Sequence, residues 1–442
     1  MSVHEHRNPT VRRQRSRGRP ATPAHRRPER GEGPPGRTRE WMTMRIAMFG
    51  TRGVPARYGG FETCVEEVGR RLVRMGHDVT VYCRHGNDPR GEAGEHLGMR
   101  LVHLPALRRK SLETLSHTAL SVGHGMRRPP ESAFVFNAAN APFLPLLRAR
   151  GVPTVTHVDG LEWQRAKWGG AGKHYYRAAE AMSVRWSDAL IADSRGIQDY
   201  YSHRFGVDTD YIPYGAPVLR AAGSDSLSEY GLRAGHYHLL VARFEPENNI
   251  HLAVEGYLAS GARHPLVLVG AAPYADSYTA LVRRQAARGD GILFAGPVWD
   301  QRVLDQLYAN ALSYVHGHSV GGTNPSLLRA MGAATAVSAY DVSFNREVLG
   351  PYGAYFSDAT ELAECFDAAE RAPHRTAERG RLQLTRLTQH YDWDRVARDY
   401  ADLAERVRHT GLSPRAGRRP SLLARLRAGT TQEQREQRAK RE

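Results

Sequence analysis

Cysteines are few in this sequence, and it contains no long apolar run. Cys64, Cys83 and Cys365 lie far apart in a chain of 442 residues and form no CxxC pair, so neither a disulfide scaffold nor a cysteine zinc site is indicated. No segment approaches 18 consecutive apolar residues, and the N-terminal segment has no apolar signal core. We therefore expect a cytoplasmic protein that can still attach peripherally to the inner membrane face.

The chain also lacks two common glycine-rich phosphate motifs. The first strand-to-helix loop, GTRGVPARYGGFET at 50–63, is neither GxGxxG nor a loop that ends in GK[ST]. The second strand ends in Cys83 and Arg84 rather than in an acidic residue that could bind a ribose. These absences argue against a dinucleotide-binding protein and against a P-loop protein.

Positive charge is concentrated at the two ends of the chain. Residues 1–41 carry +7 and residues 414–442 carry +6 of the total of +16, so the body between them carries +3. Both ends are poor in aromatic and β-branched residues and cannot offset the entropy of ordering, so we predict disordered basic tails. Such tails can bind an anionic membrane surface. For the first tail we favour a solvated segment or an early start codon, with Met42 or Met44 as the natural start, and we do not expect nucleic-acid binding.

Between the tails, short apolar runs alternate with amphipathic stretches. This alternation is typical of strands joined by helices in a parallel sheet. A turn-rich connection near residues 216–234 separates two such series. We therefore predict an α/β protein of two doubly wound Rossmann-like domains with an interdomain cleft. The predicted parts are a tail at 1–41, domains at 44–216 and 217–390, a helix crossing the junction at 391–412, and a tail at 413–442.

Two stretches of the second series are candidates for binding a phosphate. Arg243 follows the strand that opens this series, where its guanidinium could grip a pyrophosphate; the alternative is an ordinary surface arginine. The stretch GGTNPSLLRAM, which begins at Gly321, reads as a Gly-rich loop and a helix start whose free N–H groups could bind an anion. Its alternative is a capping turn, with Thr323 or Asn324 as the N-cap.

A third candidate is the polar and aromatic cluster THVDGLEWQRAKW, which directly follows an apolar strand. Clusters of this kind at a strand end favour a binding site. His157 and Asp159 lie two residues apart, so on a strand they would share a face. The alternatives are a buried core histidine for His157 and a turn-capping aspartate for Asp159.

Together these residues resemble the GT-B glycosyltransferases of family 4, and most closely their rhamnosyltransferase-like branch of capsule and exopolysaccharide synthesis. The resemblance runs in order from about residue 44 to residue 400. The stretches that carry it are GTRGVPARYGGFET, KSLETLSHT, VDGLEWQRAKW, ADSRGI, YIPYGAP, PENN, HGHSVGGTNPSLL and NREVLG.

The resemblance implies a nucleotide-diphosphate sugar as co-substrate, held mainly by the C-terminal domain, and an acceptor held by the N-terminal domain. It further implies no cofactor, no bound metal and retention of the anomeric configuration. Carried over by position, the catalytic candidates are Asp159, His157 and Arg243. The donor-binding candidates are Arg243, Asn248, Val298, Gly321, Gly322, Thr323, Asn324, Ser326 and Arg329. The acceptor-binding candidates are Arg57, Gly59, Gly60, Glu162, Trp163 and Arg165.

One position departs from the family pattern. The broad family has two glutamates eight residues apart, at positions that correspond here to Gly321 and Arg329. The glycine looks normal for the rhamnosyltransferase-like branch, whereas the arginine does not, and an arginine cannot accept hydrogen bonds from ribose hydroxyls. A deoxyribose carrier loses less from this change, so a dTDP-sugar is weakly favoured over a UDP- or GDP-sugar.

Three functions compete at this stage. The leading hypothesis is a glycosyltransferase that moves a sugar, with rhamnose as one candidate, to a saccharide or lipid-linked saccharide in cell-surface polysaccharide synthesis. The first alternative is a sugar-nucleotide epimerase, because such enzymes can share the two-domain architecture. The second is a degenerate, non-catalytic sugar-nucleotide-binding protein, which Arg329 motivates.

Overall fold

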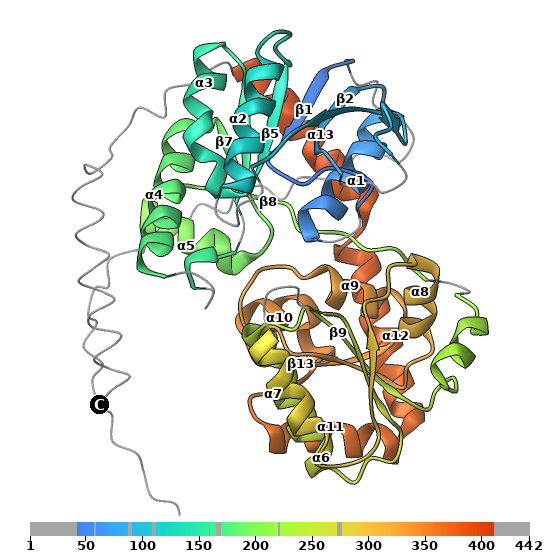
Figure 1. Cartoon of the computed structure of the whole chain (residues 1–442). Coiled ribbons are helices and arrows are strands. Elements are labelled where there is room, and N and C mark those ends of the chain that lie inside the picture. The colour runs from blue at the N-terminus through green and yellow to red at the C-terminus, as the bar shows by residue number, and fades with distance from the viewer. Residues whose placement is uncertain are drawn as a thin grey trace, which may run out of the picture. The chain divides into compact units, whose positions relative to one another are not determined.

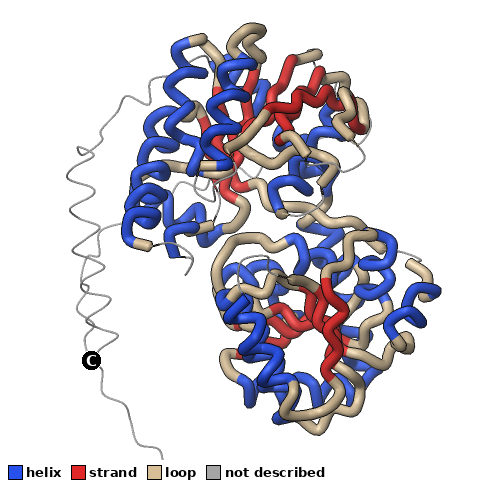
Figure 2. Tube along the Cα trace, in the orientation of Figure 1, coloured by secondary structure: helices blue, strands red, loops and turns tan. Residues whose placement is uncertain are grey.

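A computed structural model describes residues 42–56, 59–86, 91–107, 112–158, 160–164, 169–219, 222–271 and 276–410. Most of both predicted tails, and the predicted site residues Arg57, Asp159 and Arg165, lie outside these ranges. The described chain forms two β-sheets, and helices cover both faces of each (Figure 1, Figure 2).

The first sheet has the order β3-β4-β2-β1-β5-β6-β7-β8. All its pairs are parallel except β3 with β4. Every residue of β5, β6 and β7 is buried, as expected for strands covered on both faces. Its strands are β1 (Arg45–Phe49), β2 (Asp78–Arg84), β3 (Glu95–His96), β4 (Met99–Leu104), β5 (Ser132–Phe136), β6 (Thr154–Val158), β7 (Ala189–Ala192) and β8 (Asp210–Tyr211).

The helices of the first half connect these strands. In α1, Cys64, Val65, Val68 and Leu72 recur at helical spacing and are buried, which explains why this segment is an amphipathic helix. The helices are α1 (Gly60–Arg74), α2 (Glu113–Gly125), α3 (Leu144–Ala149), α4 (Gly170–Trp186) and α5 (Arg195–Phe205), with 3₁₀ turns η1 (Ala138–Phe143) and η2 (Glu162–Gln164).

The second sheet has the order β11-β10-β9-β12-β13-β14, and its pairs are parallel. Its strands are β9 (His238–Val241), β10 (Leu266–Val269), β11 (Ile292–Gly296), β12 (Ser313–His316), β13 (Ala336–Tyr340) and β14 (Ala354–Phe356). Its helices are α6 (Ile250–Ala259), α7 (Asp276–Ala286), α8 (Gln301–Ala309), α9 (Pro325–Gly332), α10 (Ser343–Leu349), α11 (Ala359–Arg371) and α12 (Pro373–His390), with 3₁₀ turns η3 (Asp225–Tyr230), η4 (Pro246–Asn248) and η5 (Gly350–Tyr352).

The last two helices contact different sheets. Helix α12 packs against α9 and β13 of the second half, whereas α13 (Trp393–Thr410) packs against α1, β5 and β6 of the first. The chain therefore returns to the first sheet in α13, and it places buried side chains of this helix, Tyr400 among them, beside β5 and β6.

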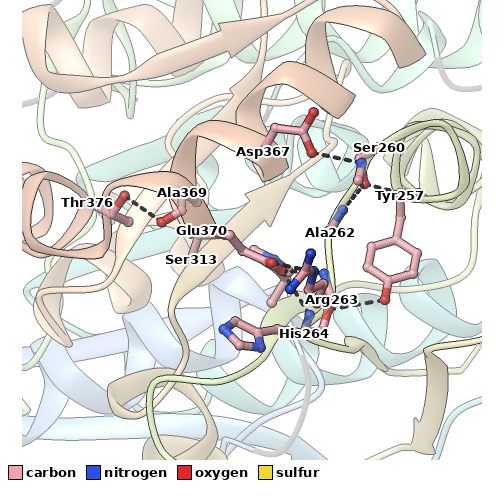
Figure 3. A network of polar contacts seen from close by, with 12 residues as sticks. Tyr257, Ser260, Ala262, Arg263, His264, Ser313, Asp367, Ala369, Glu370 and Thr376 are labelled. Atoms are coloured by element: carbon pink, nitrogen blue, oxygen red, sulfur yellow. Dashed lines mark hydrogen bonds and ion pairs between the residues drawn. The ribbon is translucent and has the colours of Figure 1, made fainter.

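A network of polar side chains links the N-terminal ends of β9 and β12. His238 Nδ1 lies 2.7 Å from Ser313 Oγ, and His238 Nε2 lies 3.2 Å from Glu370 Oε1. Figure 3 shows Glu370, on α11, accepting hydrogen bonds from the backbone N–H groups of Arg263 and His264. Ligands of parallel sheets bind at the carboxyl ends of the strands. The network therefore holds the opposite edge of the sheet together.

Candidate functional site

The carboxyl ends of β6 and β7 bring the first set of predicted site residues together. The two strands are parallel, with His157 opposite Ile191 and Val158 opposite Ala192. The segments that follow them, at 160–164 and at Asp193, therefore leave the same edge of the first sheet. This is the edge at which open parallel sheets bind ligands.

His157 is fully buried in an aromatic cage at this edge. The centroid of its ring lies 5.2 Å from that of Phe61, 5.6 Å from those of Phe136 and Tyr214, and 6.3 Å from that of Tyr400. Burial lowers the pKa of His157 to about 3, so the imidazole is neutral at physiological pH. Its ring lies in the core, and among the described residues its Nε2 atom has no hydrogen-bond partner.

The segments after β6 and β7 contact the glycine-rich loop that precedes α9. Thr323 Oγ1 donates a hydrogen bond to the carbonyl oxygen of Asp193 at 2.5 Å. The carboxylate of Asp193 packs on Gly322 so closely that a Cβ atom there would overlap both oxygens. A Cβ atom on Gly160 would lie 2.9 Å from the backbone of Gly321. Only glycine fits this approach at 160 and 322 without displacement.

Asp193 belongs to this candidate site by its contacts, although the sequence did not indicate it. It is buried with 3% of its surface exposed, and it follows β7 within the stretch ADSRGI. The next residue, Ser194, caps α5 through its side chain, which accepts from the N–H of Ile197. An acidic residue directly after an apolar strand was the available signal, but its position beside a helix cap made an ordinary turn the simpler interpretation.

The N-terminus of α9 is capped by Asn324. Its side-chain oxygen accepts hydrogen bonds from Ser326 N at 3.0 Å and from Ser326 Oγ at 2.8 Å. The start of α1 lies nearby, since a Cβ atom on Gly60 would lie 3.4 Å from Pro325 and 3.6 Å from Tyr214. Gly59, with φ of 116°, is the N-cap position of α1. Both helix N-termini, which carry partial positive charge, therefore meet beside the glycine-rich loop.

Arg243 lies just past the end of β9, with its side chain one-third exposed. Its Nη1 atom donates to Glu245 Oε1 at 3.3 Å. Asn248 is buried and turned inward, where its Nδ2 atom donates to the carbonyl oxygen of Arg243 at 2.7 Å. The loop is tied to the segment after β12, because Asn249 Nδ2 donates to the carbonyl oxygen of Gly317 at 2.9 Å. Hydrogen bonds of Asn248 and Asn249 therefore connect Arg243 with the segment that leads from β12 to α9.

The remaining predicted residues lie at the borders of this region. Arg329, on α9, is paired with Asp305 on α8, with Nε to Oδ1 at 2.6 Å. Val298 is half-buried between β11 and α8. Glu162 is buried in η2, and the ring of Trp163 beside it is covered by the guanidinium of Arg177, 4.3 Å from its centroid.

In the described ranges, no cluster of three or more His, Cys, Asp or Glu side chains is arranged to hold a metal ion. None of the helices described there is both long and apolar enough to cross a membrane.

Comparisons with known proteins show similarity to a family in the first half and to solved structures in the fold. Residues 59–215 match the family model described as a glycosyl transferase 4-like domain. This range runs from the N-terminus of α1 to the loop after β8, and it includes His157 and Asp193. No curated protein is similar enough to the chain to count as a match.

Solved structures match nearly the whole described chain. Sucrose-phosphate synthase from Thermosynechococcus elongatus has a TM-score of 0.71 at 20% identity, covering 83% of this chain and 99% of its own. Anabaena HepE in complex with UDP-glucose has a TM-score of 0.66 at 15% identity, covering 82% and 100%. A trehalose-6-phosphate structure from E. coli, bound with UDP-2-fluoro glucose, has a TM-score of 0.63 at 12% identity, covering 82% and 99%.

The chain therefore has the two-domain, Rossmann-like GT-B fold that the sequence predicted. Residues 59–215 of its first half are similar to a glycosyl transferase 4-like domain. The expectation of a glycosyltransferase is confirmed by the match of residues 59–215 to a glycosyl transferase 4-like domain.

Proposed function

We propose that this chain, a glycosyl transferase 4-like domain joined to a second Rossmann-like half, transfers a sugar from a nucleotide-diphosphate donor to a saccharide or lipid-linked saccharide, with retention. One observation carries the proposal: Asp193 and Gly160 of the first half lie directly against Gly322 and Gly321, at the start of α9. A donor bound at this helix start would have the glycosyl transferase 4-like domain beside its sugar. Rhamnose and a role in cell-surface polysaccharide synthesis belong to this proposal as well.

The chemistry that the site must supply is stabilisation of a leaving diphosphate. Negative charge grows on the leaving oxygen as the glycosidic bond breaks, and fixed donors aimed at that oxygen lower the barrier. The N–H groups at the start of α9, together with the helix dipole, provide such donors without a metal. Arg243 can add a charge-assisted hydrogen bond from the framework that holds the same loop.

The acceptor side of the proposal uses the first half. His157 and Asp159 would lie nearest the anomeric carbon, and Gly59, Gly60, Glu162, Trp163, Arg57 and Arg165 would border the acceptor. The neutral imidazole of His157 supports a hydrogen-bonding role rather than an ionic one, because burial keeps it uncharged.

The donor base is best chosen by experiment among uracil, thymine and guanine. HepE and the E. coli protein were solved with UDP-glucose and UDP-2-fluoro glucose respectively, which makes UDP a strong candidate here. The preference for dTDP rests on Arg329 alone and stays a prediction.

Thermal unfolding of the full chain with UDP, dTDP, GDP, ADP and CDP tests the donor site. A nucleotide at about 100 times its Kd stabilises the folded state by about 2.7 kcal/mol, so one of the five is expected to raise the Tm. The sugar nucleotide of the responding base is then incubated with and without an acceptor mixture. Release of nucleotide diphosphate only with an acceptor supports transfer, a new sugar nucleotide without acceptor supports the epimerase, and a raised Tm with neither product supports the degenerate binding protein. Silence across the panel contradicts a nucleotide-binding site.

A further inference from the structure

Three buried side chains from distant parts of the sequence form a hydrogen-bonded row in the first half. Cys64 lies on α1, His157 on β6 and Tyr400 on α13, and each has 0% of its surface exposed. The hydroxyl oxygen of Tyr400 lies 2.7 Å from His157 Nδ1 and 3.5 Å from Cys64 Sγ. Tyr400 thus bridges the other two side chains.

The direction of these hydrogen bonds follows from which protons are present. Burial keeps His157 neutral, with one N–H, and it raises the pKa of the Cys64 thiol to about 12, so that the thiol keeps its proton. Burial also raises the pKa of Tyr400 well above its usual value, so its hydroxyl is protonated. Each of the three groups therefore holds exchangeable hydrogen, and only the order of donation is open.

The strengths of the acceptors decide that order. An unprotonated imidazole nitrogen is a good acceptor, whereas a thiol sulfur is a weak one. If Tyr400 donates to His157, the thiol of Cys64 can donate to the Tyr400 oxygen, and both contacts are satisfied. In the reverse order His157 would donate to Tyr400, and the hydroxyl hydrogen could go only to the sulfur. The first order uses the better acceptor.

The hydrogen bond to Nδ1 also determines the state of the other ring nitrogen of His157, Nε2. With Nδ1 accepting, the single hydrogen of the imidazole is on Nε2. This atom is buried and has no partner among the described residues, and an unsatisfied buried donor destabilises the fold. The ring packs against Tyr214, which in turn lies beside Gly60, near the start of α9.

We propose that Tyr400 is a positioning residue for His157: its hydroxyl holds the imidazole in the Nε2–H tautomer, and this N–H is presented to an oxygen atom of the bound sugar. The ligand class is a hydroxyl or ether oxygen, because an N–H donor rejects another donor or a cation. The inference rests on the proposed function for the identity of the ligand, but the tautomer itself is a property of the protein alone. It also gives the C-terminal helix α13 a part in the site.

The tautomer is tested directly by nitrogen NMR of the full chain labelled with [¹⁵N]histidine. His157→Gln identifies the His157 signals by their loss. In the unsubstituted protein we expect the hydrogen on Nε2 and a bare Nδ1, and Cys64→Ala is expected to leave this pattern unchanged. In Tyr400→Phe we expect averaged nitrogen shifts, because both tautomers become populated. A hydrogen on Nδ1 in the unsubstituted protein, or an unchanged pattern in Tyr400→Phe, overturns the proposal.

Kinetics then separate positioning from general packing. Tyr400→Phe is expected to lower kcat by about 10-fold, in the range seen when a group that orients a functional imidazole is lost, with the donor KM little changed. The double variant with His157→Gln is expected to be no slower than His157→Gln alone, because Tyr400 acts through His157. Independent, multiplying losses overturn the proposal.

Tyr237→Phe is the matched control. Tyr237 is equally buried, and its hydroxyl donates to the carbonyl oxygen of Leu307 at 2.6 Å in the second half. It is expected to lose a similar amount of stability and no kcat; an equal loss of kcat there overturns the positioning role. If no substrate is turned over, the proposed function fails, whereas the NMR result still decides the tautomer. If Tyr400→Phe does not fold, the unsubstituted protein and Cys64→Ala still decide it.

Discussion

Arg329 and Asp305 form a side-on ion pair between two neighbouring helices. The Nε and Nη2 atoms of Arg329 on α9 lie 2.6 and 2.5 Å from Oδ1 of Asp305 on α8, and both side chains are about one-fifth exposed. The arginine that breaks the family pattern is therefore neutralised by a carboxylate from the adjacent helix. Its charge is part of the packing between α8 and α9, which weakens the argument that the site has decayed.

The first prediction concerns this pair. Arg329→Glu alone places a carboxylate against Asp305 and is expected to lower the free energy of unfolding by about 1–2 kcal/mol, as for a partly buried pair that loses one partner. The double variant Arg329→Glu with Asp305→Arg restores opposite charges and is expected to recover most of this loss. Urea unfolding measures both. A single variant as stable as the unsubstituted protein would show that the pair contributes nothing.

The second prediction concerns Arg243. Arg243→Ala is expected to reduce turnover by about 10²-fold, the loss typical of one strong donor to a developing negative charge. Arg406→Ala is the control, because Arg406 is half-exposed on α13 and pairs with Asp210 on β8. Initial rates of nucleotide release measure both variants. Equal rates for Arg243→Ala and Arg406→Ala would remove Arg243 from the mechanism.

The third prediction ranks three glycines by the stability that is lost when each is replaced by alanine. In Gly160→Ala the new Cβ meets the backbone of Gly321 at 2.9 Å, whereas in Gly322→Ala it meets the carboxylate of Asp193, which can move. We expect Gly160→Ala to lose about 1–3 kcal/mol of stability and Gly322→Ala to lose less. Gly123→Ala on α2 meets nothing within 4 Å and is expected to be neutral or slightly stabilising. Denaturant unfolding gives the order, and a Gly160→Ala protein as stable as Gly123→Ala contradicts the observed contact.

The fourth prediction concerns acid stability and Glu370. Burial raises the pKa of Glu370, but hydrogen bonds from His238 and from the amides of Arg263 and His264 outweigh it and lower the pKa to about 2 (Figure 3). Because the folded pKa is below the unfolded value near 4.5, this carboxylate stabilises the fold above pH 4.5, and the contribution is lost as the pH falls toward 2. Glu370→Gln is expected to remove about 1–2 kcal/mol at pH 7 and much less at pH 3. An equal loss at both pH values would contradict this.

The fifth prediction has the opposite sign and concerns Glu180 on α4. Burial raises the pKa of this carboxyl to about 7, although the hydroxyl of Tyr200 donates to it at 2.8 Å and Arg204 and Arg177 lie near. As the pH rises from 4.5 to 7 the unfolded chain releases this proton while the folded chain keeps it, so stability falls. Glu180→Gln is expected to be up to about 3 kcal/mol more stable than the unsubstituted protein at pH 8, and to lose this advantage near pH 4.5. Thermal unfolding across this pH range measures the difference in stability between the two proteins. A difference that does not change with pH would show that Glu180 is not the group that titrates.

Much of the fold was readable from the sequence, because burial on both faces leaves a local pattern. The apolar runs AFVF in β5 and ALIA in β7 and the helical spacing of Val65, Val68 and Leu72 each depend on near neighbours in the chain. The same holds for Asn324 as the N-cap of α9, since its partner Ser326 is two residues away. The loops at the strand ends could be located in this way, together with most of the residues assigned to them.

Contacts between distant residues could be decided only by the tertiary structure. Asp193 reaches Gly322 and Thr323 across about 130 residues of sequence, and Tyr400 reaches His157 across 243. The periodicity of apolar residues in the sequence does not indicate such pairs, because they depend on how complete elements pack and not on local propensity. The sequence by itself determined two series of α/β units, their glycine-rich loops and the family resemblance. The tertiary structure decided that Arg329 is paired with Asp305, that His157 is buried with one nitrogen that has no partner among the described residues, and that helix α13 returns to the first sheet. Each of these results from packing between segments that are distant in sequence.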